Sequence, residues 1–402
     1  MANVSSSNGL EKYPKLRFKG FSEPWKSVRI GEIYAERSER GAEDMELLSV
    51  TMNDGVKMRS DIEGKDNSSE DKSNYKIVRA GDMVYNSMRM WQGANGISPW
   101  NGIVSPAYTV LKSRIPLSNG FFAALFKTHR LINEFRKNSQ GMTSDTWNLK
   151  YPQIETIKTC IPALAEQEKI AVFLIALDQR IEKQRTLVEH LKKYKRGLLN
   201  RYFRSNVGDC KYIPLSELIL EIMDGDWIES KDQSSFGIRL IQTGNVGVGE
   251  YIDKPDSAKY ISASTFEHLH CTEIYPGDIL ISRLPSPAGR ACIVPITNER
   301  MITAVDCTIV RCDDTRCIRE YLIQFLNSPQ YFKEVESFLA GGTRQRISRK
   351  NLESILVPIL QLPEQKYIAN ILSTFDKKIH NEAEQLQELI RYKRGLLQAL
   401  FV

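Results

Sequence analysis

Four short stretches of the chain gather side chains that suit hydrogen bonds to bases and phosphates. Two of them follow Gly-Asp dipeptides and contain "YNSMRMWQGANG" and "ISRLPSPAGR", which mix Asn, Gln, Ser and Arg with Met and Trp. Such side chains bond base edges and pack on bases. The others are "TMNDGVKMRS", which overlaps the stretch "SVTMNDG" that resembles "IQTGNVG", and "GGTRQRISRK", whose guanidiniums suit phosphates while Gln345 suits an adenine edge. The candidate DNA contacts are Asn53, Lys57, Arg59, Asn86, Arg89, Gln92, Gln242, Asn245, Arg283, Arg290, Arg344, Gln345 and Arg346.

Each of these side chains has an ordinary alternative role. A single arginine on a surface is often solvated or paired with a carboxylate of its own chain. The cluster from Arg344 to Lys350 and the loop that contains Arg283 are the stretches in which we expect DNA contact most.

Catalytic motifs are missing from the sequence. There is no G-x-x-x-x-G-K-[ST], no H-E-x-x-H, no G-x-S-x-G and no N-P-P-[FY] or D-P-P-[FY]. The Pro-Asp at Pro255 lacks a following E-x-K, so a nuclease core is unsupported. The glycine-rich "GNVGVGEY" (244–251) lacks the dinucleotide-binding spacing and predicts a hairpin turn. We therefore expect no catalytic residue in this chain.

The cysteines and histidines give little support for a metal site. Cys307, Cys312 and Cys317 are evenly spaced, but no C-x-x-C with a matching His pair occurs. "HLHC" (268–271) offers two possible ligands, although a structural role is the simpler interpretation. We expect no metal, and seven reduced, mostly buried thiols in a cytoplasmic protein.

Length and charge are compatible with two domains and a polyanionic partner. The chain has 402 residues and a formal net charge of +6. No apolar run approaches the roughly 18 residues of a membrane span, and the first residues lack the apolar core of a signal peptide. We expect no membrane association.

A repeat dominates the chain. "YKRGLL" occurs at 194–199 and again at 392–397, and the surrounding 38 residues align without a gap. In each copy apolar residues recur at spacings of 4, 3 and 4, which predicts a long helix with a heptad seam. The residues expected in helix pairing or subunit docking are Glu166, Gln167, Leu174, Ile181, Leu191, Glu364, Gln365, Leu372, Ile379 and Leu389.

Each predicted helix needs a partner, because a lone amphipathic helix is unstable in water. The other copy, running antiparallel, is the simplest choice. Gln184 and Glu382 interrupt the seam at equivalent positions, where they either fix the register or reach solvent. Gly197 and Gly395 weaken the helices and predict a close contact or a helix end.

The segments before the helices are also weakly alike. Short β-branched runs separated by Gly, Pro and Asn predict strands, and the stretches from Gly120 and Cys317 predict helices. The predicted fold is α+β, with two pseudo-symmetric mixed α/β target-recognition domains separated by two long helices in an antiparallel coiled coil. The predicted domains are recognition domain 1 (1–160), spacer helix 1 (161–205), recognition domain 2 (206–360) and spacer helix 2 (361–402). Helices of about 39 residues would separate two DNA readers by at most about 58 Å, or on the order of 17 base pairs.

The pattern P-x-x-x-EQ-x-x-IA-x-x-L-x-x-x-D-x-x-I, repeated after each domain, resembles the specificity subunit of type I restriction–modification systems. "PKLRFKGFSEPW" near the start and the Gly-Asp turns also resemble that family. The resemblance implies two domains that each recognise half of a bipartite double-stranded DNA target. It also implies spacer helices that pair and dock two methyltransferase subunits, which restriction subunits then join. S-adenosylmethionine, ATP and Mg would belong to those partners.

Two other classes of function remain open from the sequence. One is an autonomous enzyme, such as the recognition part of a restriction–methylation fusion with unrecognised catalytic residues. The other is a coiled-coil interaction protein without a DNA role. Methyl transfer by the chain alone would favour the first, and absence of salt-dependent duplex binding by the reconstituted complex would favour the second.

Overall fold

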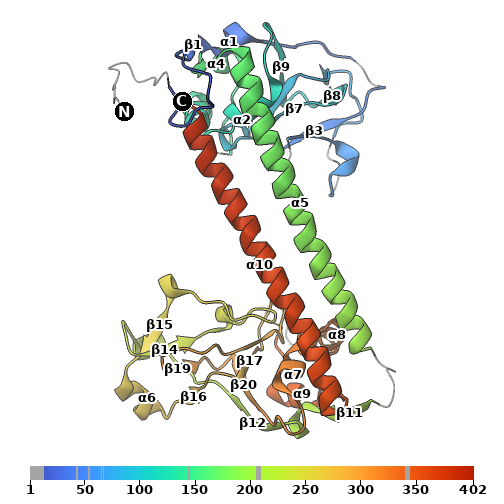
Figure 1. Ribbon diagram of the computed structural model, residues 1–402, viewed down its shortest axis with the longest axis vertical. Helices are drawn as coiled ribbons and strands as arrows, with labels where there is room; N and C mark the ends of the chain where they lie inside the picture. Colours follow the sequence, from blue (N-terminus) through green and yellow to red (C-terminus); the bar gives the residue numbers. More distant parts are fainter. Residues whose placement is uncertain are drawn as a thin grey trace. The chain divides into compact units, whose positions relative to one another are not determined.

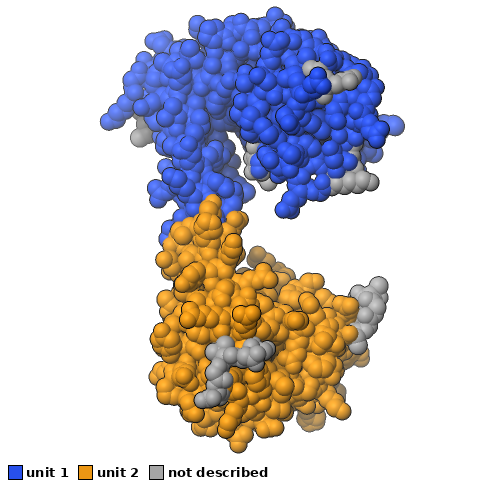
Figure 2. All heavy atoms as spheres, turned by 90° about the vertical axis from the view of Figure 1, so that its right-hand side faces the viewer, with its two compact units in different colours: residues 1–185, 384–402 blue, residues 186–383 orange. Residues whose placement is uncertain are grey.

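The chain forms two compact units. The computed structural model describes residues 13–41, 44–52, 55–64, 66, 68–143, 145–204, 210–339 and 345–402. Unit 1 comprises residues 1–185 and 384–402, and unit 2 comprises residues 186–383 (Figure 2). Each unit thus contains the beginning of one long helix and the end of the other. The predicted division into four segments stays a prediction, because the compact units divide the chain at other positions.

The described part of unit 1 forms four small antiparallel sheets, and some of their strands are labelled in Figure 1. The largest has the order β2-β9-β6-β7, and the others are the pairs β1-β10, β3-β4 and β5-β8. The strands are β1 (Lys26–Arg29), β2 (Tyr34–Glu36), β3 (Leu48–Thr51), β4 (Gly55–Met58), β5 (Lys76–Val78), β6 (Met83–Asn86), β7 (Asn95–Ile97), β8 (Gly102–Val104), β9 (Tyr108–Ser113) and β10 (Lys158–Ile161).

Short helices complete unit 1. They are α1 (Ile30–Ile33), α2 (Asn119–Leu125), α3 (His129–Asn138) and α4 (Tyr151–Ile154), with 3-10 turns η1 (Arg59–Asp61) and η2 (Met90–Gln92). The helical stretch predicted from Gly120 onward is two helices, because Thr128 caps α3 by accepting a hydrogen bond from the Leu131 amide.

Unit 2 contains a two-stranded, a four-stranded and a five-stranded sheet. Their orders are β11-β21, β12-β20-β17-β18 and β13-β15-β14-β19-β16. The strands are β11 (Lys211–Pro214), β12 (Ile219–Asp224), β13 (Gln233–Ser234), β14 (Ile238–Ile241), β15 (Lys259–Ile261), β16 (Glu273–Ile274), β17 (Ile279–Ser282), β18 (Ala291–Ile293), β19 (Met301–Thr303), β20 (Cys307–Cys312) and β21 (Leu356–Ile359).

The helices of unit 2 repeat the pattern of unit 1. They are α6 (Ala263–Leu269), α7 (Arg319–Phe325), α8 (Pro329–Ser337) and α9 (Arg349–Ser354), with 3-10 turns η3 (Leu215–Glu217), η4 (Ser230–Asp232), η5 (Thr243–Asn245) and η6 (Pro255–Ser257). Ser328 caps α8, and Pro329 occupies its first turn, so this predicted helical stretch is also split in two.

The two units share a central sheet motif. In unit 1, Met83 pairs with Leu111 on one side and Ile97 on the other. In unit 2, Ile279 pairs with Val310 and Ile293 in the same way. The weak sequence similarity between the two segments therefore reflects a shared strand order, and the predicted mixed α/β fold class is confirmed.

The long helices are α5 (Leu164–Tyr202) and α10 (Leu362–Leu400). In unit 1 the core combines the start of α5, including Ile170 and Leu174, with the end of α10, including Leu396. In unit 2 the start of α10, including Leu372, shares a core with Leu199 near the end of α5. Within each unit the two helices therefore pair in opposite directions.

The glycines of the repeat do not have the predicted role. A Cβ atom placed on Gly197 or Gly395 would meet nothing within 4 Å among the described residues. Both residues also lie inside their helices, which continue to Tyr202 and Leu400. The prediction of a close contact or helix end was wrong, and a side chain at either position would point into open space.

Candidate nucleic-acid interface

In each unit one backbone hydrogen bond joins the loop after a central strand, β6 or β17, to a segment far along the chain. The Ile347 amide donates to the Arg283 carbonyl over 3.3 Å, which connects the loop after β17 to the segment before α9. The Leu149 amide donates to the Ser87 carbonyl over 2.8 Å, which connects the equivalent segments of unit 1. Loops about 60 residues apart in sequence therefore form one surface in each unit.

In unit 1 the loop after β6 is held by its own backbone and by Asn86. The Asn86 Oδ1 accepts a 3.0 Å hydrogen bond from the Met88 amide, so this side chain shapes the turn. Arg89 is exposed, and its guanidinium has no carboxylate partner among the described residues. Gln92 is half-buried at the end of η2, and Gly93 closes the turn with φ of +90°. Arg89 is thus the group of this loop most available to a phosphate.

An aromatic cluster joins the two loops of unit 1. The rings of Trp91 and Trp147 lie 5.1 Å apart, edge to face, and the Arg136 guanidinium lies 5.4 Å from the Trp147 ring. Met142, on the loop with Trp147, is fully exposed. The list of candidate contacts omitted all four. Trp147 lies in "GMTSDTWNL" (141–149), which resembles "GGTRQRISR" of the second half, and this similarity was the available signal.

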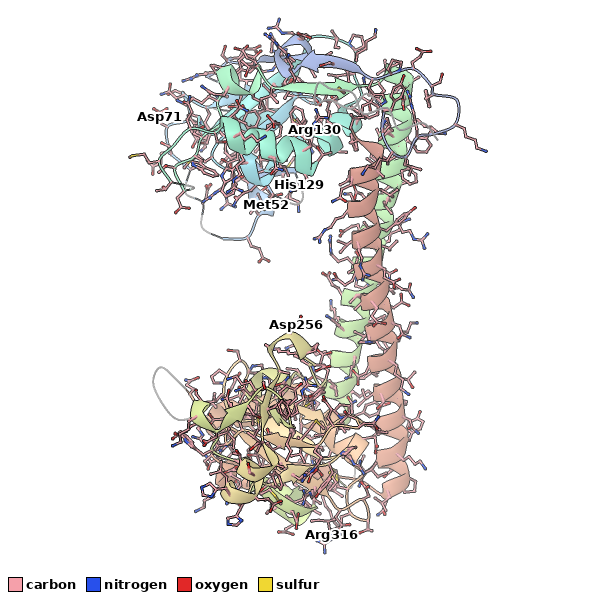
Figure 3. The ribbon with its side chains drawn as sticks, turned by 90° about the vertical axis from the view of Figure 1, so that its left-hand side faces the viewer. Met52, Asp71, His129, Arg130, Asp256 and Arg316 are labelled. Atoms are coloured by element: carbon pink, nitrogen blue, oxygen red, sulfur yellow. The ribbon has the colours of Figure 1, made fainter. Side chains whose placement is uncertain are left out.

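The β3-β4 hairpin carries the other candidates of unit 1. Lys57 is half-buried on β4. Arg59 donates to the carbonyls of Ile62 and Gly64 over 2.7 and 3.0 Å, so its guanidinium braces the following loop. Asn53 lies outside the described residues. Met52, exposed at the end of β3, is labelled in Figure 3.

In unit 2 Arg283 is almost completely buried. Its guanidinium lies 3.3 Å from the Asp224 carboxylate and donates to the Val305 carbonyl. Burial lowers the pKa of Arg283, an effect that Asp224 opposes. The predicted direct contact with DNA is not favoured by this geometry, because the side chain is already committed to its own domain.

Arg290 is likewise an internal brace. Its guanidinium donates to the carbonyls of Val246, Leu284, Pro287 and Thr243 over 2.6 to 2.9 Å. These bonds tie the turn at 243–246 to the loop after β17. Burial lowers the pKa of Arg290, and its placement favours a positioning role over a base contact.

Gln242 and Asn245 form a reciprocal cap around η5. The Asn245 side chain accepts from the Gln242 amide over 3.0 Å and donates to the Ile252 carbonyl over 2.9 Å. It is buried, and both its oxygen and its nitrogen are hydrogen-bonded within the domain. The Gln242 side chain accepts from the Asn245 amide. The predicted "GNVGVGEY" turn is confirmed, since Val246 and Tyr251 form an antiparallel bridge.

The segment before α9 presents the exposed cations of unit 2. Gln345 and Arg346 are both exposed, and Arg346 lies 3.4 Å from Asp306. Arg349 lies 3.3 Å from Glu353 and remains partly exposed. Arg344 lies outside the described residues. The guanidiniums of unit 2 that are available to a DNA phosphate therefore lie on this segment, because those of Arg283 and Arg290 are bound within the domain.

The two glutamines of the repeated EQ motif have the same role in each unit. Gln365 accepts from the Ile318 amide over 2.9 Å and donates to the Leu360 carbonyl over 2.9 Å. Gln167 accepts from the Ser118 amide over 3.1 Å and donates to the Pro162 carbonyl over 3.0 Å. Both are buried and anchor a long helix to its own domain, so they do not lie in the seam between helices as we expected.

The two glutamates differ from one another. Glu166 is buried and accepts two hydrogen bonds from Arg17, of 2.8 and 2.7 Å. Glu364 accepts from the Gln361 amide over 3.3 Å and caps α10. Of the apolar candidates, Leu174, Ile181 and Leu389 belong to the core of unit 1 and Leu372 to that of unit 2, while Leu191 and Ile379 are half-buried. A docking role for any of these residues stays a prediction.

The remaining sequence candidates occupy structural positions. His268 lies in α6, and His270 caps that helix with φ of 50°. All seven cysteines are free, and five are buried, as predicted. Among the described residues no group of three or more His, Cys, Asp or Glu side chains could hold a metal ion. No helix in the described part of the chain is long and apolar enough to cross a membrane.

This geometry defines a class of duplicated proteins in which long helices carry mixed α/β domains with paired surface loops. Residues 219–391 match the family model described as "Type I restriction modification DNA specificity domain". The Type I restriction enzyme MjaVIII specificity subunit of Methanocaldococcus jannaschii is 22% identical over 344 residues, covering 81% of this chain and 79% of that protein. The putative type I specificity subunit S.HindORF215P of Haemophilus influenzae is 31% identical over 161 residues, covering 37% and 39%.

Solved structures show the same fold. The type I restriction–modification S subunit from M. genitalium has a TM-score of 0.60 at 15% identity, with 97% of this chain and 99% of that chain covered. A chain from a study of assembly and conformational transition of the type I system has a TM-score of 0.58 at 18% identity, covering 93% and 96%. Residues 219–391 thus match the type I specificity domain, and over most of its length the chain is similar to type I restriction–modification specificity subunits.

Proposed function

We propose that this chain is the DNA-recognition subunit of a type I restriction–modification complex, and that each of its two domains recognises one half of a bipartite double-stranded target. The observation that carries the proposal is the equivalent loop pair of the two units. The bond from Leu149 to Ser87 and the bond from Ile347 to Arg283 tie down loops that follow the equivalent strands β6 and β17 of the two sheets.

The side chains on the two loop pairs differ, as two readers of different half-sites require. Unit 1 presents Trp91, Trp147 and the unpaired Arg89, whereas unit 2 presents Gln345 and Arg346. Aromatic rings and methionines suit base stacking or insertion, and guanidiniums and amides suit phosphates and base edges. A net charge of +6 favours a polyanionic partner for the whole chain.

The proposal assigns methylation and cleavage of DNA to partner subunits. Two methyltransferase subunits would dock on the helices α5 and α10, and restriction subunits would join the complex. S-adenosylmethionine, ATP and Mg would bind those partners, and this chain would be non-catalytic and cytoplasmic. The exposed Tyr194 and Tyr392, at equivalent positions of the repeat, are available for such docking.

The test is co-expression with the neighbouring methyltransferase, followed by genome-wide mapping of methylated adenines by long-read sequencing. We expect a bipartite motif with an unread gap. Replacing the residues before Glu166 with those of another specificity subunit should change one half-site and leave the other. An intact complex without modification, or a continuous motif, would contradict the proposal.

A further inference from the structure

The surface of unit 2 has two adjoining hollows beside the η5 turn. One measures about 570 Å³ and the other about 290 Å³, and both are lined by Gln242 and Lys259. Trp227 and Lys231 line the first, and Lys254 lines the second. Apart from Gln242, none of these residues was among the candidates from the sequence.

Two lysines of the hollows have no carboxylate partner among the described residues. Lys254 and Lys259 carry unpaired ammonium groups, whereas Lys231 lies 2.9 Å from Glu229. Arg239 lines the second hollow, but Asp253 and Glu299 already neutralise it. Lys254 and Lys259 are therefore the cations of the two hollows that no carboxylate of the described residues already holds.

The ammonium of Lys254 lies close to Gly244 of the turn. A Cβ atom on Gly244 would lie 3.0 Å from the Lys254 Nζ, so the bare backbone leaves room for the ammonium over η5. Asp256, on the neighbouring η6, is exposed and is labelled in Figure 3. Asp256 stands in sequence between Lys254 and Ser257, which both line the second hollow, so we expect its carboxylate to oppose the charge of the lysines.

Gln242 is oriented before any ligand arrives. Its side-chain oxygen accepts from the Asn245 amide in the η5 cap. Its Nε2 has no hydrogen-bond partner among the described residues, so two N–H donors remain available to the hollows. Such a fixed donor suits an acceptor on a base edge, such as O6 or N7 of guanine or O4 of thymine.

Trp227 adds an apolar surface at the rim. Its side chain is 71% exposed, and its Nε1 donates to Glu229 over 3.4 Å. A large aromatic side chain exposed beside unpaired lysines is typical of nucleic-acid contacts rather than of an ordinary surface.

We infer that this double hollow is a specificity-determining DNA contact of the second domain, in which Gln242 donates to a base edge, Lys254 and Lys259 bind the flanking phosphates, and Trp227 packs on the sugar or base. The inference rests on the proposed function. It assigns base recognition in unit 2 to residues outside the arginine-rich loops.

The test uses the complex with its methyltransferase and a duplex carrying the mapped motif, with affinity measured at several salt concentrations. Gln242→Glu keeps the oxygen that accepts from Asn245 but removes the donor, and we expect at least a 10-fold loss of affinity. Methylome mapping should show relaxed or altered bases in the half-site of the second domain only. Gln387→Glu, exposed on α10, makes the same charge change elsewhere and should have little effect.

The lysines should act on affinity without changing the motif. Lys254→Ala and Lys259→Ala should each weaken binding to all duplexes and reduce the slope of log K against log salt by about 1. Asp256→Asn should strengthen binding. Salt-dependent binding by the wild type with unchanged Gln242, Lys254 and Lys259 variants would overturn this inference and leave the proposed function standing. A wild-type complex that neither binds nor methylates duplex DNA would overturn both.

Discussion

The ammonium of Lys195 pairs with the carboxylate of Asp376, and Lys393 pairs with Asp178 in the same way. Lys195 and Lys393 are the lysines of the two "YKRGLL" copies, and the aspartates are equivalent positions of the repeat. The duplicated sequence therefore makes the same contact once in each unit. This reciprocity explains why the hexamer occurs twice: each copy belongs to the unit that contains the start of the other helix.

The two ion pairs should differ in strength. Lys195 is 14% exposed and Lys393 is 30% exposed, and Asp376 also accepts from Gln324 over 2.8 Å. In a double-mutant cycle with Lys195→Met and Asp376→Asn, we expect a coupling of about 1 kcal/mol from denaturant unfolding. The cycle on Lys393 and Asp178 should give less. Equal coupling, or none in either cycle, would contradict the importance of burial.

The helix anchors should be costly to remove. Gln365→Ala would leave the Ile318 amide and the carbonyls of Leu360 and Arg316 without their partner. We expect a loss of about 2–4 kcal/mol in the free energy of unfolding, since each buried polar group left unpaired is unfavourable. Gln387→Ala on the same helix is exposed and should change stability by less than about 0.5 kcal/mol. A similar cost for both variants would argue against the anchor.

The apolar seam should be most sensitive where it is buried. Ile181 belongs to the core of unit 1, whereas Leu191 is half-buried outside the described clusters. Ile181→Asp should therefore destabilise the chain by several kcal/mol, on the order of 3–5. Leu191→Asp should cost less and act mainly on assembly with methyltransferase subunits, measured by co-purification. Normal assembly of Leu191→Asp would count against docking at this position.

Arg290 should act on recognition through the shape of its loop. Arg290→Lys cannot bond the four carbonyls that the guanidinium reaches, so we expect a loss of about 3 kcal/mol in stability. Arg89→Lys, at an exposed site, should leave stability unchanged and weaken duplex binding only slightly. Wild-type stability of the Arg290 variant would show that the loop keeps its shape without these bonds.

The thiols should be largely inert in the folded chain. Burial raises the pKa of Cys271 to about 11 and that of Cys292 to about 12, so almost no thiolate exists at pH 8. Cys210 is only partly buried, and we expect maleimide to label it first and more rapidly as the pH rises. Mass spectrometry should show seven labels only after unfolding. Rapid labelling of Cys292 in the native chain would contradict its burial.

The sequence predicted those features that are written locally and repeatedly. Heptad spacing predicted both long helices, because apolar residues every 3.5 positions form one stripe on a helix. The β-branched runs predicted strands, and the Gly-Asp dipeptides predicted the turns before them. The structure has φ of +93° at Gly81 and +95° at Gly277, a conformation that favours glycine. The equivalent strands of the two units then followed from their similarity.

Side-chain roles could not be predicted in the same way. Arg283 and Arg290 have the residue type and loop position of DNA contacts, yet the tertiary structure surrounds them with Asp224 and backbone carbonyls. Whether a guanidinium faces solvent depends on residues that arrive from distant strands. For the same reason the sequence did not single out Lys254 and Lys259, because whether a lysine has a carboxylate partner depends on the tertiary structure.

By itself, the sequence determined that the chain is a duplication with two long helices and two mixed domains, because periodicity and repetition are properties of residue order. Only the tertiary structure decided which helix end completes which core. Phe401 packs on Trp25 and Phe121 in unit 1, while Phe203 packs on Tyr321 in unit 2. Each core must bury the apolar end of a helix that begins in the other half of the chain, and residue order alone does not specify that exchange.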